Sequence, residues 1–158
     1  MLTGLVTHWA VYYADHKAVS IAVTYLHVAA VFVGGGAAIT LDAAVLRARR
    51  AGHEARTRVL ETLASSHRTV VPALVVVCTT GLLLLASDRE TFLALPLFYA
   101  KMAMVAALLL NGSLLLLAER RATTRGDAGW RLLTVVSGAS LFLWLAILLA
   151  GTWLPVAG

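Results

Sequence analysis

Residues 69–86 read TVVPALVVVCTTGLLLLA and contain no charged side chain over eighteen consecutive positions. The hydrocarbon core of a bilayer is about 30 Å thick, and a helix of about 20 apolar residues crosses it. Together with three further apolar segments, this one predicts an all-α integral membrane four-helix bundle with spans at about residues 19–46, 69–86, 92–118 and 132–155. We expect residues 1–158 to form a single four-span membrane domain.

The composition also places the chain among membrane proteins. Hydrophobic residues make up 60% of it and charged residues 13%, whereas a soluble domain has about 25% charged residues. A net charge of +5 would favour nucleic acid binding in a soluble protein, but here the arginines lie between apolar runs, where they contact anionic lipid. We therefore expect the lipid bilayer as a partner and no nucleic acid. A single cysteine, Cys78, excludes an internal disulfide and a cysteine-based zinc site.

The basic residues are distributed unevenly between the two sides of these spans. Ten arginines lie in the gaps that follow the first and third spans: Arg47, Arg49, Arg50, Arg56, Arg58, Arg68, Arg120, Arg121, Arg125 and Arg131. The opposite side carries Lys17 and Arg89. Because short loops rich in Lys and Arg stay in the cytoplasm, the sequence predicts a multi-pass protein of the cell inner (plasma) membrane with the N-terminus and the C-terminus outside.

The segment before the first span predicts an additional short helix. Leu5, Trp9, Tyr12 and His16 recur at helical spacing within residues 1–16. Tryptophan and tyrosine favour the headgroup region of a membrane. We expect a short interfacial helix on the outer face.

Three ionisable residues lie inside the spans, and each needs an interaction partner or a functional role. The reason is that inserting such a group into a membrane costs about 2.5–3.5 kcal/mol on insertion scales. They are His27, Lys101 and Asp42. Asp42 precedes Arg47 by about one turn, so we expect it to pair with Arg47 or with Arg68 and to serve assembly.

We expect His27 and Lys101 to lie at the same depth in the membrane. His27 precedes Arg47 by 20 residues and Lys101 precedes Arg120 by 19, which corresponds to about 30 Å at 1.5 Å per residue. Both therefore belong to the outer half of the bundle. His67 lies at the opposite boundary, so we do not expect it to be a second ligand of the same metal as His27.

Small residues and a thioether lie near this level. Ala30, Gly34 and Ala38 share a stripe with His27, and such a row lets a neighbouring helix or a flat cofactor approach the backbone. Met104 follows Lys101 by about one turn. We therefore take His27, Lys101, Met104 and Gly34 as candidate cofactor-binding residues, with His27 as the candidate metal ligand.

A family resemblance rests on these residues. The run Phe98-Tyr99-Ala100-Lys101-Met102, followed by Asn111-Gly112, resembles the third span of small four-helix membrane families related to the copper-resistance D membrane domain. The first span, with His27, Gly34-Gly35-Gly36 and Asp42, also resembles theirs. The layout is similar to that of the four-helix protoporphyrinogen oxidases, which have a histidine on helix one and a lysine on helix three. The resemblance implies that His27 is a haem ligand and that Lys101 is that lysine.

Three functions are consistent with this pattern. The first is binding of a haem b, with His27 as axial ligand, for electron transfer or for porphyrin or haem redox chemistry. The second is copper transport or resistance, for which the spans offer Cys78, Met102 and Met104 as soft ligands. The third is a non-catalytic accessory subunit that contacts partner subunits of a membrane respiratory complex.

We predict that the first arginine-rich gap faces the cytoplasm. A cysteine introduced at Ala55 (Ala55→Cys) should resist a membrane-impermeant thiol reagent in intact cells and react after permeabilisation. A cysteine at Asp88 (Asp88→Cys), in the gap on the other side, should react in intact cells. Labelling of position 55 from outside would contradict the orientation.

Overall fold

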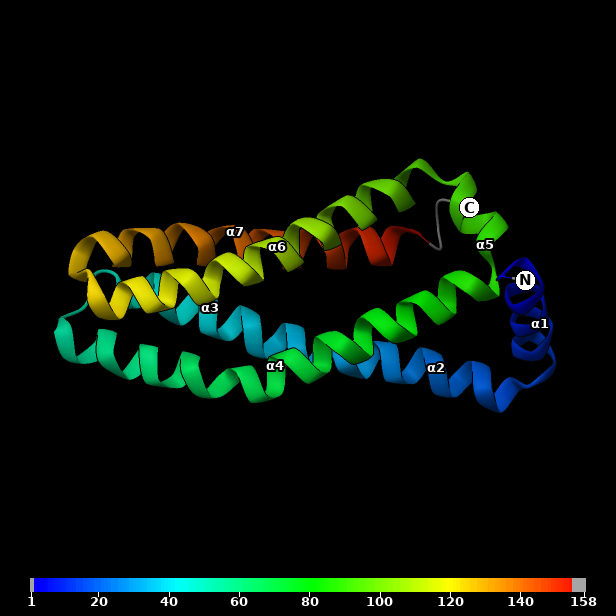
Figure 1. The fold of residues 1–158 in the computed structure, drawn as a ribbon, viewed down its shortest axis with the longest axis horizontal. Coiled ribbons are helices and arrows are strands. Elements are labelled where there is room, and N and C mark those ends of the chain that lie inside the picture. The colour runs from blue at the N-terminus through cyan, green and yellow to red at the C-terminus, as the bar shows by residue number, and fades with distance from the viewer. Residues whose placement is uncertain (1, 155–158) are drawn as a thin grey trace.

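The computed structural model describes residues 2–154, which form helices and, over those residues, no strand (Figure 1). In chain order they are α1 (Leu2–Asp15), α2 (Lys17–Ala30), the π-helical turn η1 (Val31–Gly35), α3 (Gly36–Ala48), α4 (His53–Ser87), α5 (Arg89–Ala94), α6 (Pro96–Thr124) and α7 (Gly126–Trp153). Pro155, the predicted end of the fourth span, lies outside the described residues.

Four of these units are long and apolar enough to cross a membrane: the continuous helix from Lys17 to Ala48 that α2, η1 and α3 form, and α4, α6 and α7. Large apolar side chains cover their outer surfaces, and Phe32, Leu110 and Phe142 are each about 70% exposed or more. Such a surface is stable against acyl chains and not against water. The predicted all-α four-span membrane bundle is confirmed.

The two ends of the bundle differ in character. The α3–α4 and α6–α7 connections lie together at one end, which carries the arginine-rich gaps and is called the arginine end below (Figure 1). Helix α1, the α4–α5 connection and the last turn of α7 lie at the opposite end, called the terminal end. Both groups of arginines are therefore on the same side of the bundle.

Helix α4 begins well before the predicted second span. It starts at His53, sixteen residues ahead of Thr69. Residues 53–68 contain good helix formers, and Glu54 forms an ion pair with Arg58 one turn later. Leu63 in this segment is 2% exposed, so the extension is held by packing against the other helices. The chain between the first two spans is therefore mostly helical.

The third span begins later than predicted, at Pro96 and not at Phe92. Leu95 is extended, with φ −96° and ψ 119°, because the residue before a proline avoids the helical region. Pro96 then occupies the first turn of α6, where its missing N–H is not needed. Phe92 belongs instead to α5, a short helix capped by Asp88, whose carboxylate accepts a hydrogen bond from the Thr91 N–H.

The expected N-terminal helix is present as α1, which packs against α4 at the terminal end. The Trp9 indole N–H donates a hydrogen bond to the Leu83 carbonyl of α4, with Nε1 and O 2.9 Å apart. The ring of Trp9 also lies against Tyr13. A single directional contact thus fixes α1 to the end of a membrane-spanning helix.

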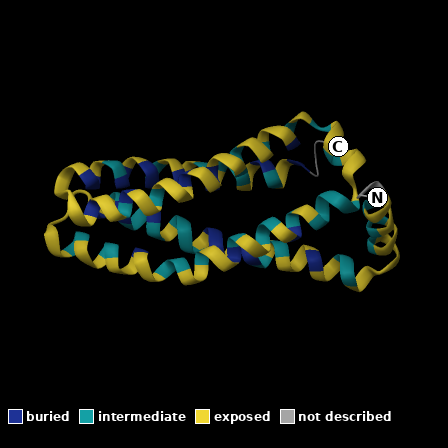
Figure 2. Ribbon diagram, viewed as in Figure 1, coloured by how far each residue is buried: buried dark blue, intermediate teal, exposed yellow. Residues whose placement is uncertain are grey.

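The buried apolar core lies in the half of the bundle nearest the arginine end (Figure 2). Its members come from α3, α4, α6 and α7: Val45, Ala48, Leu63, Ala118, Ala122, Trp130, Leu133 and Val136. Helix α6 packs along α7, α3 packs on α7, and α2 packs on α4, whereas α2 has no comparable contact with α6 or α7. Helices α2 and α6 diverge toward the terminal end (Figure 1).

Gly34 allows a close contact between the first span and α4. A Cβ at this position would lie 2.7 Å from the Cβ of Ala73 on α4, which is well inside van der Waals contact. Its neighbour Gly35 faces the Trp144 ring of α7 in a similar way, with a built Cβ 3.0 Å from the ring. Both lie in η1, a π-helical turn that inserts one residue and shifts the faces of the helix. The predicted small-residue stripe therefore receives a neighbouring helix at Gly34.

We predict that Gly34→Ala destabilises the bundle by about 1–3 kcal/mol through overpacking against Ala73. Gly36→Ala is the matched control, because a Cβ at Gly36 meets nothing within 4 Å. It should be neutral or slightly stabilising. Thermal or SDS-induced unfolding in detergent measures both variants. Adding Ala73→Gly should recover part of the loss in Gly34→Ala, and equal effects of the two glycine substitutions would contradict the packing account.

Candidate functional site

The imidazole of His27 is the half-buried centre of the site. It projects from α2 onto α4, where Nδ1 lies 2.9 Å from the Thr80 hydroxyl oxygen. That hydroxyl donates its own proton to the Val76 carbonyl, 2.6 Å away. A hydroxyl has one proton to donate, so Thr80 must accept from His27. In the neutral ring the proton therefore lies on Nδ1. The Val77 carbonyl is a second acceptor beside the ring.

Nε2 of His27 projects away from the Thr80 hydroxyl, because the two nitrogens of an imidazole point to different sides of the ring. A Cβ built at Gly81 would lie 3.3 Å from Cε1 and 3.8 Å from Nδ1. The absence of a side chain at Gly81 therefore lets the Nδ1–Cε1 edge of the ring pack against α4. A histidine whose Nδ1–H is held by a hydrogen bond is the usual arrangement of a metal-ligating imidazole, because the bond fixes both the tautomer and the ring orientation.

Lys101 reaches the same region from α6. Its side chain is half-buried, and its ammonium interacts electrostatically with His27. A Cβ built at Gly151 of α7 would lie 3.5 Å from Nζ, so the absence of a side chain at Gly151 leaves space for the ammonium. The four spans thus each contribute: His27 from the first, Thr80 and Gly81 from the second, Lys101 from the third, and Gly151 from the fourth.

The other two candidate residues have different surroundings. Gly34 is buried against Ala73, so at this position the backbone is covered by α4. Met104 is half-buried on α6, three residues beyond Lys101. Thr80, Gly81 and Gly151 complete the surroundings of His27 and Lys101, and sequence reasoning did not identify them as a set because they are common residues in apolar runs.

Asp42 does not pair with an arginine, so that prediction is wrong. Five residues at 100° each turn Arg47 about 140° away from Asp42 on the helix surface. Asp42 is 2% exposed and faces α7, where it interacts with Ser140 and Ser137. The contact is not a well-formed hydrogen bond, because Asp42 Oδ2 and the Ser137 hydroxyl each lack a partner that meets hydrogen-bond geometry within residues 2–154.

His67 lies at the arginine end, away from the site of His27. Its Nε2 is 3.0 Å from Glu119 Oε2, an ion pair when the imidazole is protonated, and this contact joins α4 to α6. The partners are 52 residues apart, which explains why the sequence did not reveal them. The pair is a structural link between two spans.

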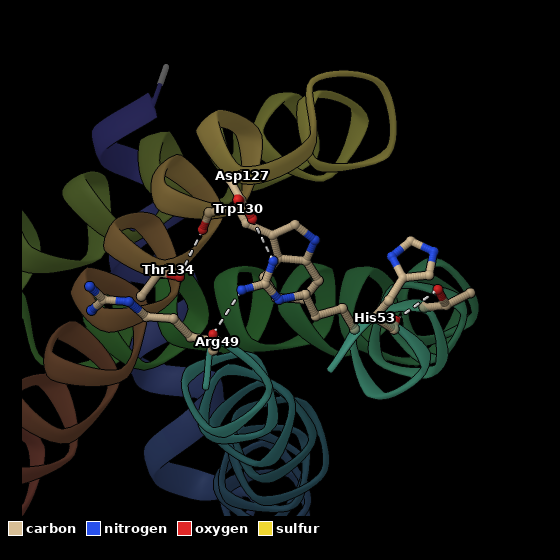
Figure 3. Close-up of polar contacts among 7 residues, drawn as sticks. Arg49, His53, Asp127, Trp130 and Thr134 are labelled. Carbon is tan, nitrogen blue, oxygen red and sulfur yellow. Dashed lines mark hydrogen bonds and ion pairs between the residues drawn. The ribbon is translucent and has the colours of Figure 1, made fainter. Parts of the chain in front are cut away.

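Arg56 contacts three groups at the same end of the bundle, and Figure 3 labels its partners Arg49, Asp127 and Trp130. Nη1 donates to Asp127 Oδ1 at 2.7 Å, and Nη2 donates to the Arg49 carbonyl at 2.9 Å. Its guanidinium also lies over the Trp130 ring, 5.2 Å from the centroid. These contacts join the start of α4 to the end of α3 and the start of α7. The arginine end is therefore fixed by polar contacts as well as by the apolar core.

The described residues provide little for a copper site. Within residues 2–154 no group of three or more His, Cys, Asp and Glu side chains is close enough to hold a metal ion. The soft ligands are divided between helices, with half-buried Cys78 on α4 and exposed Met102 on α6. Those two helices make little contact apart from the His67–Glu119 pair.

Comparisons with protein-family models, with curated proteins and with solved structures give no match. The resemblance to the copper-resistance D and four-helix protoporphyrinogen oxidase families therefore remains a prediction.

We predict that the neutral His27 ring carries its proton on Nδ1. Nitrogen-15 solid-state NMR of histidine-labelled protein in bilayers should report a protonated Nδ1 and an unprotonated Nε2 for this residue. Thr80→Ser keeps the hydroxyl acceptor and should preserve the spectrum, whereas Thr80→Val removes it and should change the tautomer balance. A wild-type ring protonated on Nε2 alone would contradict the hydrogen-bond assignment.

Proposed function

We propose that this chain binds a b-type haem, with Nε2 of His27 as the axial ligand, and serves electron transfer or redox chemistry of porphyrin or haem. The observation that supports this most directly is the Nδ1–H···Thr80 hydrogen bond, which leaves Nε2 free and holds its direction. Hydrogen-bonding partners of this kind typically change metal affinity by about 10–100-fold.

The chemistry of the surrounding residues fits a haem. The ammonium of Lys101 lies within electrostatic reach of His27 and suits a propionate carboxylate. The absence of side chains at Gly81 and Gly151 lets the imidazole pack closely on α4 and the Lys101 ammonium on α7. A cation held in an apolar bundle is costly without an anion, so a propionate between the two spans offsets that cost.

A bound haem supplies a one-electron redox centre whose potential depends on its axial ligand and on the polarity around it. The protein's own contribution is positional. Thr80 holds the imidazole, Gly81 allows the ring to pack on α4, and Lys101 orients a carboxylate. The apolar helices keep bulk water away from the half of the site that faces the core.

We further propose that the arginine end faces the cytoplasm and that the chain resides in the plasma membrane. This rests on the grouping of both arginine-rich connections at one end of the bundle. The His27 site then lies in the outer leaflet half, where it can exchange electrons with a donor or acceptor on the outer side or with a partner subunit in the membrane.

We predict a reduced-minus-oxidised haem spectrum for the protein purified from haem-replete cells. His27→Ala should lose the spectrum because it removes the axial ligand. His53→Ala is the matched control, because the exposed His53 side chain forms no hydrogen bond or ion pair within the described part of the chain. His67→Ala should also retain the spectrum. Circular dichroism and a monodisperse elution profile establish that each variant is folded.

Replacement of Lys101 separates its role from that of His27. Lys101→Met should weaken haem retention several-fold and leave the axial spectrum, whereas Lys101→Arg, which keeps the charge, should retain most of the binding. Absence of haem from the wild-type protein would end the proposal and favour a non-catalytic accessory subunit whose exposed apolar faces contact partner helices.

A further inference from the structure

A hollow at the arginine end has the features of an anion site. It lies between the end of α3 and the third turn of α7, has a volume of about 370 Å³, and is lined by Leu46, Arg47, Arg49, Arg50 and Thr134. Small-molecule sites in proteins are commonly about 300–1,000 Å³. The hollow is separate from His27, which lies toward the other end of the bundle.

The three arginines of the hollow have no counter-ion among the described residues. Nearby Arg56 pairs with Asp127, and Arg58 pairs with Glu54. The side chains of Arg47, Arg49 and Arg50 form no ion pair or hydrogen bond within residues 2–154; they are exposed and lie within four positions of one another. Figure 3 shows the Arg49 side chain extending toward Thr134, away from Asp127. Three like charges around one hollow repel one another unless an anion lies among them.

One wall of the hollow is apolar. Leu46 forms this wall, and its Cδ2 lies 4.0 Å from the position of a Cβ at Gly138 on α7. The Thr134 hydroxyl is already used, because it donates to the Trp130 carbonyl at 2.7 Å. The site thus offers cations at the membrane boundary beside an apolar wall. That combination matches an amphiphile better than a free ion.

We propose that this hollow binds the phosphate headgroup of an anionic phospholipid, with an acyl chain against Leu46. Guanidinium groups bind phosphate oxygens in paired hydrogen bonds, and basic pockets between spanning helices on the cytoplasmic side are suited to such lipids. The bound lipid neutralises the arginine cluster and holds α3 against α7 at the boundary.

The other arginine-rich connection provides a charge-matched control. Arg120, Arg121 and Arg125 are also exposed, and their side chains form no ion pair or hydrogen bond within the described residues, but they do not line this hollow. A diffuse attraction to anionic lipid would depend on the two groups about equally. Specific binding of lipid in the hollow would depend on Arg47, Arg49 and Arg50 alone. Removing either group leaves seven arginines against two basic residues on the other side, so the orientation is preserved.

Native mass spectrometry of the detergent-purified protein tests the site with phosphatidylglycerol, phosphatidylcholine and inorganic phosphate as probes. Wild type should retain phosphatidylglycerol and neither of the other two. The triple variant Arg47→Gln, Arg49→Gln, Arg50→Gln should lose at least about tenfold in phosphatidylglycerol affinity, because it removes the charge-assisted hydrogen bonds to the phosphate. The control variant Arg120→Gln, Arg121→Gln, Arg125→Gln should stay within about twofold of wild type.

A second variant keeps every charge and fills the hollow. Leu46→Trp should weaken phosphatidylglycerol binding several-fold while circular dichroism and the melting temperature without lipid stay near wild type. Phosphatidylglycerol should raise the melting temperature of wild type and of the control triple variant, but not that of Arg47→Gln, Arg49→Gln, Arg50→Gln. Equal losses in the two triple variants, or displacement of the lipid by millimolar inorganic phosphate, would overturn the proposal.

Discussion

The constraint on which the structure depends is that helices in a membrane gain little from burying apolar surface, because lipid is as apolar as the protein interior. Association must come from close packing and from polar contacts. Both are concentrated toward the arginine end, where Leu63, Leu133 and Trp130 pack in the core and Arg56 joins three helices. Gly34 brings the first span against α4 partway along the bundle. The terminal half is held less tightly, and it is there that His27 and Lys101 lie.

This unequal packing separates the contacts that stabilise the bundle from the proposed site at His27. The contacts that hold α3, α4, α6 and α7 together use residues with no role at the site, such as the His67–Glu119 pair. His27 is held by one neighbouring helix through Thr80 and keeps its second nitrogen directed away from the Thr80 hydroxyl. A site built in this way can change its ligand or its potential with little effect on the core. The cost is a half-buried histidine and lysine in apolar surroundings, which an anionic, metal-containing ligand would offset.

Hydropathy and charge were sufficient to predict the four spans and the shared side of the arginine-rich connections, because both depend on composition over long windows. Boundaries depended on local chemistry, as at Pro96, which delayed the third span until after an extended Leu95. Depth counting brought His27 and Lys101 together, since a regular rise makes height predictable from residue number. It could not find Thr80 or Gly151, because the rotation of one helix about its axis relative to another is set by packing. For the same reason the predicted partner of Asp42 was wrong. The rotation of the first span about its axis turns Asp42 toward the serines of α7.

The central claim is that a haem iron binds at Nε2 of His27. Crystals grown from the haem-replete protein in a lipidic phase, with diffraction recorded on both sides of the iron absorption edge, locate that iron directly. The account predicts one anomalous peak in the terminal half of the bundle, within coordination distance of Nε2 and on the side of the ring away from Thr80. A fully ordered bundle with no iron peak, or with its peak beside His67 at the arginine end, would contradict it.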